Sequence, residues 1–349
     1  MSTECCDSYF KPLFTNYGLC FSFNGLPLNG MTNVTIPWQK SFTDVTPGSS
    51  EWSLDAGYPK VFPPPSNTLP YRVMGSGETN GLGLELYLNK SEHQFACDGN
   101  SMGFNVLLDS PTDHFYSSTL LRLPMGRMTT VELSPITYKT DSTLRSLNPD
   151  RRQCFFQNER KLVYYEFYTD SNCKHDLLIR EAVRTCNCVH FNWPRTHVAE
   201  PICSTESEFQ CIDDVKANVE KMLMYAYFDD SEEHRRPKSV STSCHPSCND
   251  ILYSSQVFYS DLIKEPGDAS PEWGSHESGD VTRVNVHFYD DMFLGQHRHM
   301  QYDDYYFVGA IGGLLSLFLG FSIISVAELL YFVVLRPLHL VLKEQFFRP

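Results

Sequence analysis

One long apolar segment near the C-terminus constrains this sequence more than any other feature. It runs over residues 305–335 and carries a single formal charge, Glu328. Its roughly 31 residues exceed the ~20 that a helix needs to cross a bilayer. A straight helix of this length would measure about 45 Å against a hydrocarbon thickness of about 30 Å, so it must tilt, protrude or break. We therefore predict a membrane-spanning helix here rather than a buried core helix.

Charged residues flank the apolar segment unevenly. Acidic residues precede it and basic residues follow it: Asp290, Asp291, Asp303 and Asp304 on one side, and Arg336, His339, Lys343 and Arg348 on the other. By the positive-inside rule, residues 1–304 lie outside the cell and residues 336–349 form a cytoplasmic tail. A carboxylate in lipid costs about 2.5–3.5 kcal/mol. Glu328 therefore faces either an aqueous path or the cytoplasmic interface, and its position leaves both alternatives open.

Twelve cysteines, an even number, are distributed unevenly along the chain. Most of them crowd residues 154–248, and the others are Cys5, Cys6, Cys20 and Cys97. Such density predicts a disulfide framework formed in an oxidising compartment. N-glycosylation sequons at Asn33 and Asn89 agree with that compartment. The first residues have neither the basic start nor the apolar stretch of a signal peptide, so we expect that the natural beginning of the chain is missing.

Alternating apolar residues bounded by Gly, Pro and Asn predict the strands of a largely antiparallel sheet. The predicted strands cover residues 19–23, 82–88, 104–108, 129–133, 162–168, 251–258 and 281–288. Two helices are predicted within the cysteine-rich block, over residues 174–184 and about 206–227, the second with apolar residues at helical spacing on one face. The predicted fold class is therefore an α+β extracellular domain followed by one transmembrane helix.

Composition and motifs exclude several classes of function. The net charge is −14 and no long basic run precedes the extreme C-terminus, which argues against nucleic-acid binding. An acidic surface concentrates cations, although it also serves solubility alone. The spacings of Cys186-Asn187-Cys188 and of Cys244 to Cys248 are not those of standard zinc sites. No hydrolase, metalloprotease, Walker or Rossmann motif occurs, so we predict neither an enzyme nor a bound cofactor or metal.

Five stretches follow one another in a recognisable order. They are YGLCFSFN at residues 17–24, GLGL at 81–84, residues 103–110, the cysteine block, and GGLLSLFLGFSIISVAELLYF at 312–332. In this order the chain resembles the degenerin/epithelial sodium channels, the amiloride-sensitive sodium channel family, and especially their insect pickpocket branch. The resemblance covers almost the whole chain, although the family's first membrane helix and the His-Gly motif before it are absent from the sequence.

The resemblance implies a function and its partners. It implies a subunit of a homo- or heterotrimeric, sodium-selective channel of the plasma membrane, blocked by amiloride-type compounds and gated through its extracellular domain. Acid-sensing members carry a Trp where this chain has Arg151, so acid gating is not implied. The alternative is a non-conducting, single-pass, disulfide-rich receptor or regulatory subunit.

The resemblance also implies how the cysteines pair, which eight cysteines alone leave open among 105 connectivities. It implies a nested ladder of Cys154–Cys248, Cys173–Cys244, Cys186–Cys211 and Cys188–Cys203, which stiffens a helical region called the thumb at about residues 154–248. The family's further rung is replaced by Leu177 and Thr242. Cys20 and Cys5 match cysteines whose family partners lie upstream, and the pairing of Cys5, Cys6, Cys20 and Cys97 stays open.

In the apolar segment, the resemblance assigns roles to single residues. Gly320, Phe321 and Ser322 match the family's selectivity filter, in which rings of oxygen ligands suit a small hard cation such as Na⁺. Gly309 matches the small residue at the external gate, and Glu328 matches an acidic position in the pore helix. Without the resemblance, Gly320 and Ser322 would instead indicate ordinary close packing of helices through small residues.

Overall fold

The chain forms two compact units, residues 1–298 and residues 299–349, and each is described separately. The computed structural model describes residues 6, 9–26, 28–33, 52–58, 69–89, 91, 102–114, 119–196, 200–228, 244–263, 281–320 and 322–339. Several residues that the sequence singled out lie outside these ranges, namely Cys5, Cys97, Thr242, Phe321, Lys343 and Arg348.

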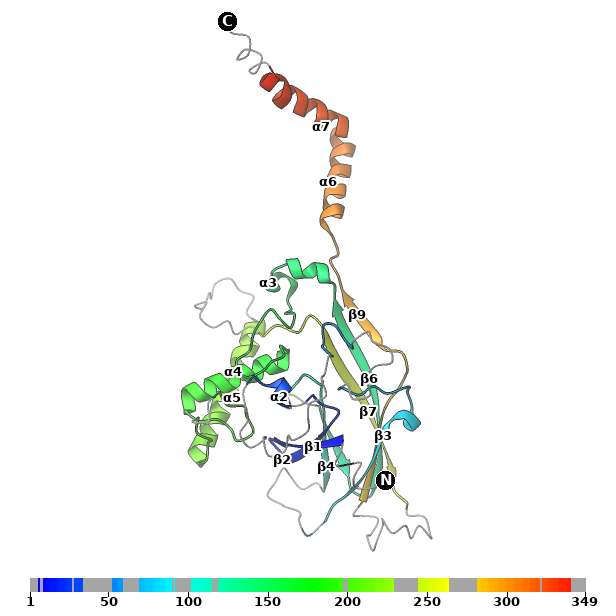
Figure 1. The fold of residues 1–349 in the computed structure, drawn as a ribbon, viewed down its shortest axis with the longest axis vertical. Helices are drawn as coiled ribbons and strands as arrows, with labels where there is room; N and C mark the ends of the chain where they lie inside the picture. The colour runs from blue at the N-terminus through cyan, green and yellow to red at the C-terminus, as the bar shows by residue number, and fades with distance from the viewer. Residues whose placement is uncertain are drawn as a thin grey trace. The chain divides into compact units, whose positions relative to one another are not determined.

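A five-stranded sheet forms the framework of the first unit (Figure 1). Its strands are β3 (Leu82–Tyr87), β6 (Arg127–Thr140), β7 (Asp250–Asp261), β8 (Val281–Phe288) and β9 (Leu294–Arg298). The order is β3-β8-β6-β7, and β9 also pairs with β6. Strand β7 runs antiparallel along the length of β6, from Arg127↔Asp261 to Tyr138↔Asp250.

The prediction of a largely antiparallel sheet is wrong on the other side of β6. There β8 pairs in parallel with the first half of β6, and β9 pairs in parallel with the second half. Alternation of apolar residues shows which face of a strand is buried but carries no information on the direction of its neighbour. The sheet is therefore mixed, and β6 extends well beyond the predicted residues 129–133 because it has partners at both ends.

Two strand pairs lie beside this sheet. Strands β1 (Phe10–Thr15) and β2 (Gly18–Phe23) form one antiparallel hairpin, and β4 (Gly103–Leu108) pairs antiparallel with β5 (Thr119–Pro124). The buried side chains of β5 pack against those of β6 and β8 in one apolar cluster: Leu121, Leu123, Val131 and Val284. The sequence predicted β2, β3, β4, β7 and β8 to within a few residues and missed β1, β5 and β9.

Helices α4 (Asp170–Cys186) and α5 (Glu206–Phe228) confirm the two helices predicted in the cysteine-rich block. Helix α4 begins four residues before the predicted start because Thr169 caps it, its hydroxyl accepting from the backbone N–H of Asn172 at 3.0 Å. The other helical segments of this unit are short: α2 (Leu28–Met31), α3 (Pro149–Arg152) and the 3₁₀ turns Glu78–Asn80 and Ser142–Ser146.

The strand predicted over residues 162–168 is wrong. This segment makes one isolated antiparallel bridge, between Tyr165 and Thr32, and several of its other backbone groups bond to side chains. The Asp176 carboxylate accepts from the N–H groups of Val163 and Tyr164 at 2.8 and 2.9 Å, and the Asn33 amide donates to the carbonyls of Leu162 and Tyr165. Side chains distant in sequence thus satisfy several backbone groups that a sheet would otherwise have satisfied.

The second unit contains α6 (Asp304–Leu319), α7 (Ile323–Leu330) and a π-helical turn, Tyr331–Leu335, after which the chain stays helical to His339. The apolar segment predicted over residues 305–335 is thus broken near Gly320, and a break is one of the three ways in which its excess length could be accommodated. Among the described residues, no one helix combines the length and apolar character needed to cross a bilayer. Asp304–Leu319 and Ile324–His339, taken as a bent pair, satisfy the criteria of length and composition.

Candidate functional site: the break at Gly320 and the disulfide-bonded helices

Gly320 ends helix α6 in a backbone conformation that favours glycine. Its φ and ψ are 61° and 22°, in the left-handed region, and its N–H donates to the carbonyl of Leu315. A Cβ placed on Gly320 would meet nothing within 4 Å. The requirement for glycine here is therefore one of backbone conformation and not of space.

Ser322 starts the next helix. Its hydroxyl accepts from the N–H of Ser325 at 3.2 Å and lies 3.2 Å from the hydroxyl of that residue. Helix α6 therefore ends and α7 begins within a few residues, and the last carbonyls of α6 lack partners within their own helix. These carbonyls and the serine hydroxyls are hard oxygen groups, and the carbonyls also form the negative end of the α6 dipole. Such groups suit a small cation.

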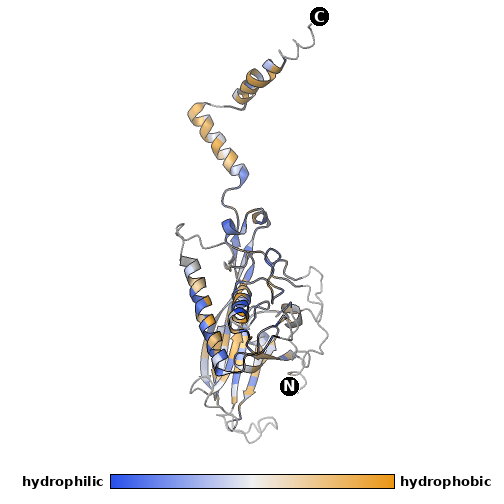
Figure 2. Ribbon diagram, turned by 90° about the vertical axis from the view of Figure 1, so that its left-hand side faces the viewer, coloured by the Kyte–Doolittle hydropathy of each residue, from blue (hydrophilic) through white to orange (hydrophobic). Residues whose placement is uncertain are grey.

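Helices α6 and α7 are predominantly hydrophobic along their length (Figure 2), and their large apolar side chains are exposed. Tyr305 is 88% exposed and Leu317 is 78% exposed. Gly309 lies within α6, where an added Cβ would meet nothing within 4 Å, and Glu328 lies exposed on α7. Because apolar helices need lipid or protein around them, these surfaces require an environment that one copy of the chain does not provide.

Four disulfides staple the cysteine-rich region. They join Cys154 to Cys248, Cys173 to Cys244, Cys186 to Cys211 and Cys188 to Cys203, with Cα–Cα distances of 4.9, 5.8, 5.9 and 5.2 Å. These are the pairs that the resemblance implies. Helices α4 and α5 share one buried cluster, and Leu177, at the position of the family's further rung, is part of it. An apolar side chain thus occupies the core where the family has a cysteine.

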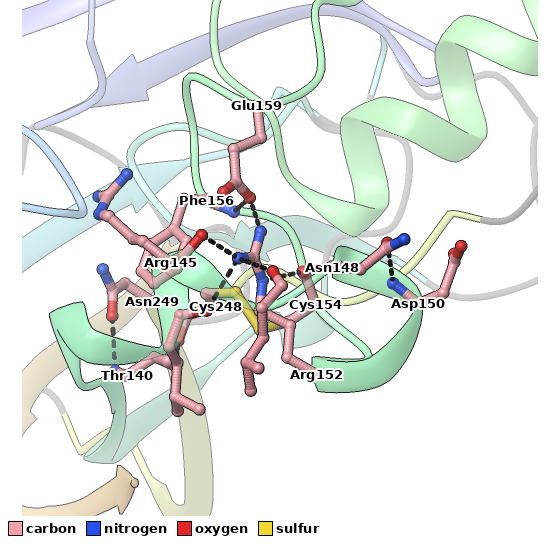
Figure 3. Close-up of polar contacts among 12 residues, drawn as sticks. Thr140, Arg145, Asn148, Asp150, Arg152, Cys154, Phe156, Glu159, Cys248 and Asn249 are labelled. Atoms are coloured by element: carbon pink, nitrogen blue, oxygen red, sulfur yellow. Dashed lines mark hydrogen bonds and ion pairs between the residues drawn. A yellow bond between two sulfur atoms is a disulfide. The ribbon is translucent and has the colours of Figure 1, made fainter. Parts of the chain in front are cut away.

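Arg152 lies two residues before Cys154, the first cysteine of the Cys154–Cys248 disulfide, and contacts the chain around it (Figure 3). Its guanidinium is 1% exposed and forms an ion pair with Glu159. It donates from Nε to the carbonyl of Cys154 at 3.0 Å, and from Nη1 to the carbonyls of Leu144 and Leu147 at 3.1 and 3.0 Å. A buried cation with this many partners fixes the loop around it, because its removal would break several hydrogen bonds to backbone carbonyls and leave Glu159 without its ion pair.

A second set of contacts joins this loop to the sheet. The guanidinium of Arg145 lies 3.9 Å from the centre of the Phe156 ring and pairs with Asp55 at 2.9 Å. Asp55 also accepts from the amide of Asn249 at 2.8 Å, and Asn249 accepts from the N–H of Thr140 at 2.8 Å. The end of β6, the start of β7 and the outer disulfide are thereby held at one junction (Figure 3).

Two histidines are buried at helix α4: His175 belongs to the helix, and His114 packs against it. The rings of His114 and His175 stack with centroids 4.9 Å apart, and His175 Nδ1 lies 2.6 Å from the Tyr165 hydroxyl. Burial lowers the pKa of His114 to about 4 and that of His175 well below its ordinary value. Burial also raises the pKa of the neighbouring Asp113 to about 8. These groups are therefore uncharged at neutral pH.

Comparison with known proteins identifies the family. The family model described as "Amiloride-sensitive sodium channel" matches residues 1–332. The chain belongs to the amiloride-sensitive sodium channel family. Members of this family are ion channels of the membrane and not enzymes, which confirms the family and the absence of enzymatic function inferred from the sequence.

Individual relatives agree with this family assignment. Pickpocket protein 28 of Drosophila melanogaster is 25% identical over 347 residues, which cover 96% of this chain and 54% of the relative. Acid-sensing ion channel 4-B of Danio rerio is 22% identical, covering 95% of this chain and 50% of the relative. Sodium channel protein Nach of Drosophila virilis is 24% identical, covering 76% and 65%. The chain thus spans about half the length of the first curated relatives it matches.

The structure places the sequence-predicted residues of this family member in two separate groups. Gly320 and Ser322 adjoin one break, whereas the four disulfides lie in the other unit. Sequence reasoning missed Arg152, Asp176 and the buried histidine pair. A basic residue two positions before a ladder cysteine was the only available signal for Arg152, and it does not distinguish a buried guanidinium from an exposed one.

Proposed function

We propose that this chain is a subunit of a trimeric, sodium-selective cation channel that amiloride-type compounds block and that its extracellular domain gates. In this proposal residues 1–304 lie outside the cell, residues 305–335 lie in the plasma membrane and residues 336–349 lie in the cytoplasm. The other subunits of the trimer are further copies of this chain or other members of the family. Family membership supports the proposal, and so does the asymmetry of charge around the apolar segment.

The observation that carries the proposal is the break at Gly320. Non-helical backbone at membrane depth is tolerated only where it is buried in protein or lines water, because lipid cannot satisfy free carbonyls. Three copies of the break would present rings of carbonyl and hydroxyl oxygens around a common axis, as a sodium filter requires. Gly320, Phe321 and Ser322 then form the filter, Gly309 lies at the external gate, and Glu328 faces the aqueous path.

The disulfide-bonded helices receive the stimulus in this proposal. Four disulfides and a shared core make α4 and α5 a stiff body. The contacts of Arg152 with Cys154 and of Asn249 with Thr140 connect that body to β6 and β7. A displacement of α4 and α5 is therefore transmitted to the sheet. Arg152 is a positioning residue in this scheme.

A matched pair of glycine substitutions tests the filter. Gly312 and Gly320 both have open space around an added Cβ, but only Gly320 has a positive φ. We expect G320A to disturb the break, at a cost of about 1–2 kcal/mol, and to lower the Na⁺-over-K⁺ permeability ratio several-fold, while G312A leaves the ratio unchanged. Whole-cell current in cells that express the complete channel measures both. Equal ratios for G320A and wild type would remove the filter assignment.

Cysteine accessibility scanning separates a channel from a subunit that does not conduct. Single cysteines introduced from Gly309 to Glu328 are exposed to a charged, membrane-impermeant thiol reagent. A pore predicts reaction on one stripe of α6 and at the break, with reaction that blocks current. If the helix only anchors a receptor or regulatory subunit, no position at membrane depth should react. That result would favour the non-conducting alternative over a channel.

A further inference from the structure

The two N-glycosylation sequons of this chain differ in what their asparagine amides do. Asn33 donates from Nδ2 to the carbonyl of Leu162 at 3.0 Å and to the carbonyl of Tyr165 at 2.8 Å. Both amide hydrogens are thus used within the protein. Asn33 and Asn89 are both exposed, but Asn89 uses its Oδ1, which accepts from the backbone N–H of Ser91 at 3.1 Å and from the Ser91 hydroxyl at 2.8 Å.

The contacts of Asn33 belong to a larger junction between distant segments. The backbone N–H of Asn33 donates to the carbonyl of Tyr164 at 3.0 Å, and the N–H of Glu166 donates to the carbonyl of Met31 at 2.9 Å. The side chain of Met31 is buried there. The short helix α2 is therefore docked against residues 162–166, which lead directly into α4 and the disulfide-bonded helices.

Glycosylation and these contacts are chemically incompatible at Asn33. In the transfer, the amide nitrogen bonds to the anomeric carbon of an oligosaccharide carried on a lipid diphosphate. The bond from that carbon to the diphosphate oxygen breaks, the lipid diphosphate leaves, and the amide gives up one proton. A glycosylated Asn33 would retain one N–H for two carbonyls and would carry a sugar in place of the other donor.

We propose that Asn33 is a structural clamp that carries no glycan in the folded protein, and that Asn89 is the glycosylated sequon. The geometry at Asn89 supports its assignment, because the hydroxyl of the sequon serine already contacts the asparagine carbonyl oxygen on an exposed turn. This inference rests on the extracellular placement of residues 1–304 in the proposed function. Beyond that function, the inference states which sequon is glycosylated and which side chain holds α2 against the segment before α4.

The chain offers a variant that separates the two roles of Asn33. T35A destroys the sequon and leaves the Asn33 side chain intact. N33D destroys the sequon and replaces the amide NH2 group, which donates to both carbonyls, with a carboxylate oxygen that can only accept. For the full chain expressed in cells with a secretory pathway, we expect T35A to leave the mobility shift on peptide N-glycosidase treatment unchanged. N89D and S91A should each remove one glycan. A shift that T35A reduces would overturn the assignment of Asn33.

Limited proteolysis tests the clamp independently of sugar. Loss of two hydrogen bonds with two carbonyls left unsatisfied predicts that N33D is cleaved about tenfold faster than T35A. Equal cleavage rates for N33D and T35A would show that Asn33 holds nothing. N89D is the control for a sequon asparagine replaced at an exposed turn, and its rate should match that of wild type.

An engineered sequon distinguishes failure of this inference from failure of the proposed function. Asp290 accepts from the N–H of Met292 at 3.3 Å, and Met292 is exposed, so that D290N/M292T creates an acceptor on a similar turn. A glycan on D290N/M292T combined with none on Asn89 would refute the assignment of Asn89 alone. Absence of glycan from both positions would refute the extracellular placement, and this inference with it.

Discussion

Helices α4 and α5 bury their apolar side chains within this chain, whereas α6 and α7 leave theirs exposed. The first pair shares a core with the segments before and between its helices, and four disulfides close it. The second pair is more apolar (Figure 2), yet its apolar side chains are exposed. The difference teaches that one region is stable by its own contacts, while the apolar surface of the other needs surroundings from outside the chain.

Truncating one leucine in each region gives the largest expected contrast. Leu178 is 1% exposed in the core around α4, and Leu317 lies exposed on α6. We expect L178A to lower the free energy of unfolding by about 2–5 kcal/mol, because it leaves a cavity, and L317A to change it by less than about 0.5 kcal/mol. Denaturant unfolding of the full chain in detergent measures both. Comparable losses would mean that α6 has a covered face within the single chain.

We expect removal of the outer disulfide, Cys154–Cys248, to lower the free energy of unfolding slightly less than L178A does. Cys154–Cys248 spans 94 residues, but Cys173–Cys244 already closes 71 of them, so the outer bond closes a further loop of only about 23 residues. The chain-entropy model then gives about 3 kcal/mol for C154A/C248A. The exposed Cys6 forms no disulfide within the described residues, and C6A serves as the control. A loss well above this value would show that the nested bonds do not share their constraint.

Acid should destabilise the disulfide-bonded region through its buried histidines. The pKa of His114 falls from about 6.5 in the unfolded chain to about 4 in the folded one, and burial also holds the pKa of His175 well below 6.5. Between pH 6.5 and 4 the unfolded chain therefore binds more protons than the folded chain at both residues, so the free energy of unfolding decreases as the pH is lowered. Asp113 acts oppositely, because its pKa of about 8 makes the folded chain bind the extra proton. Asp113 therefore cancels the contribution of one histidine, and the free energy of unfolding falls by about 2–3 kcal/mol between pH 6.5 and 4.

Variants separate these opposing contributions. D113N removes the offset and should make the fall in melting temperature between pH 6.5 and 4 about twice as steep, whereas H114F should nearly abolish it. Thermal unfolding at several pH values, followed by aromatic circular dichroism, measures the slopes. If D113N instead flattened the pH dependence, the histidines would not be the groups responsible.

Parts of this structure were predictable because they follow from local pattern. The helical spacing of Ile212, Val215 and Val219 predicted α5, since one face of a helix must be covered. Excess length predicted that the apolar segment must tilt, protrude or break, and glycine at residue 320 offered one place for a break. Other parts depended on contacts across the chain. Residues 162–168 alternate like a strand, but Asp176 and Asn33 satisfy their backbone, and no local pattern reveals such partners.

The sequence by itself determined that this chain has an oxidised, cysteine-rich domain and an apolar C-terminal segment, because cysteine density and run length are properties of consecutive residues. Only the tertiary structure decided that β8 and β9 join β6 in parallel. It also decided that Arg152 is buried against four backbone carbonyls and Glu159, and that the Asn33 amide donates to the carbonyls of Leu162 and Tyr165. The physical reason is the same in each case. A strand's direction, a cation's burial and an amide's partner are set by groups that lie far away in sequence and meet only when the chain has folded.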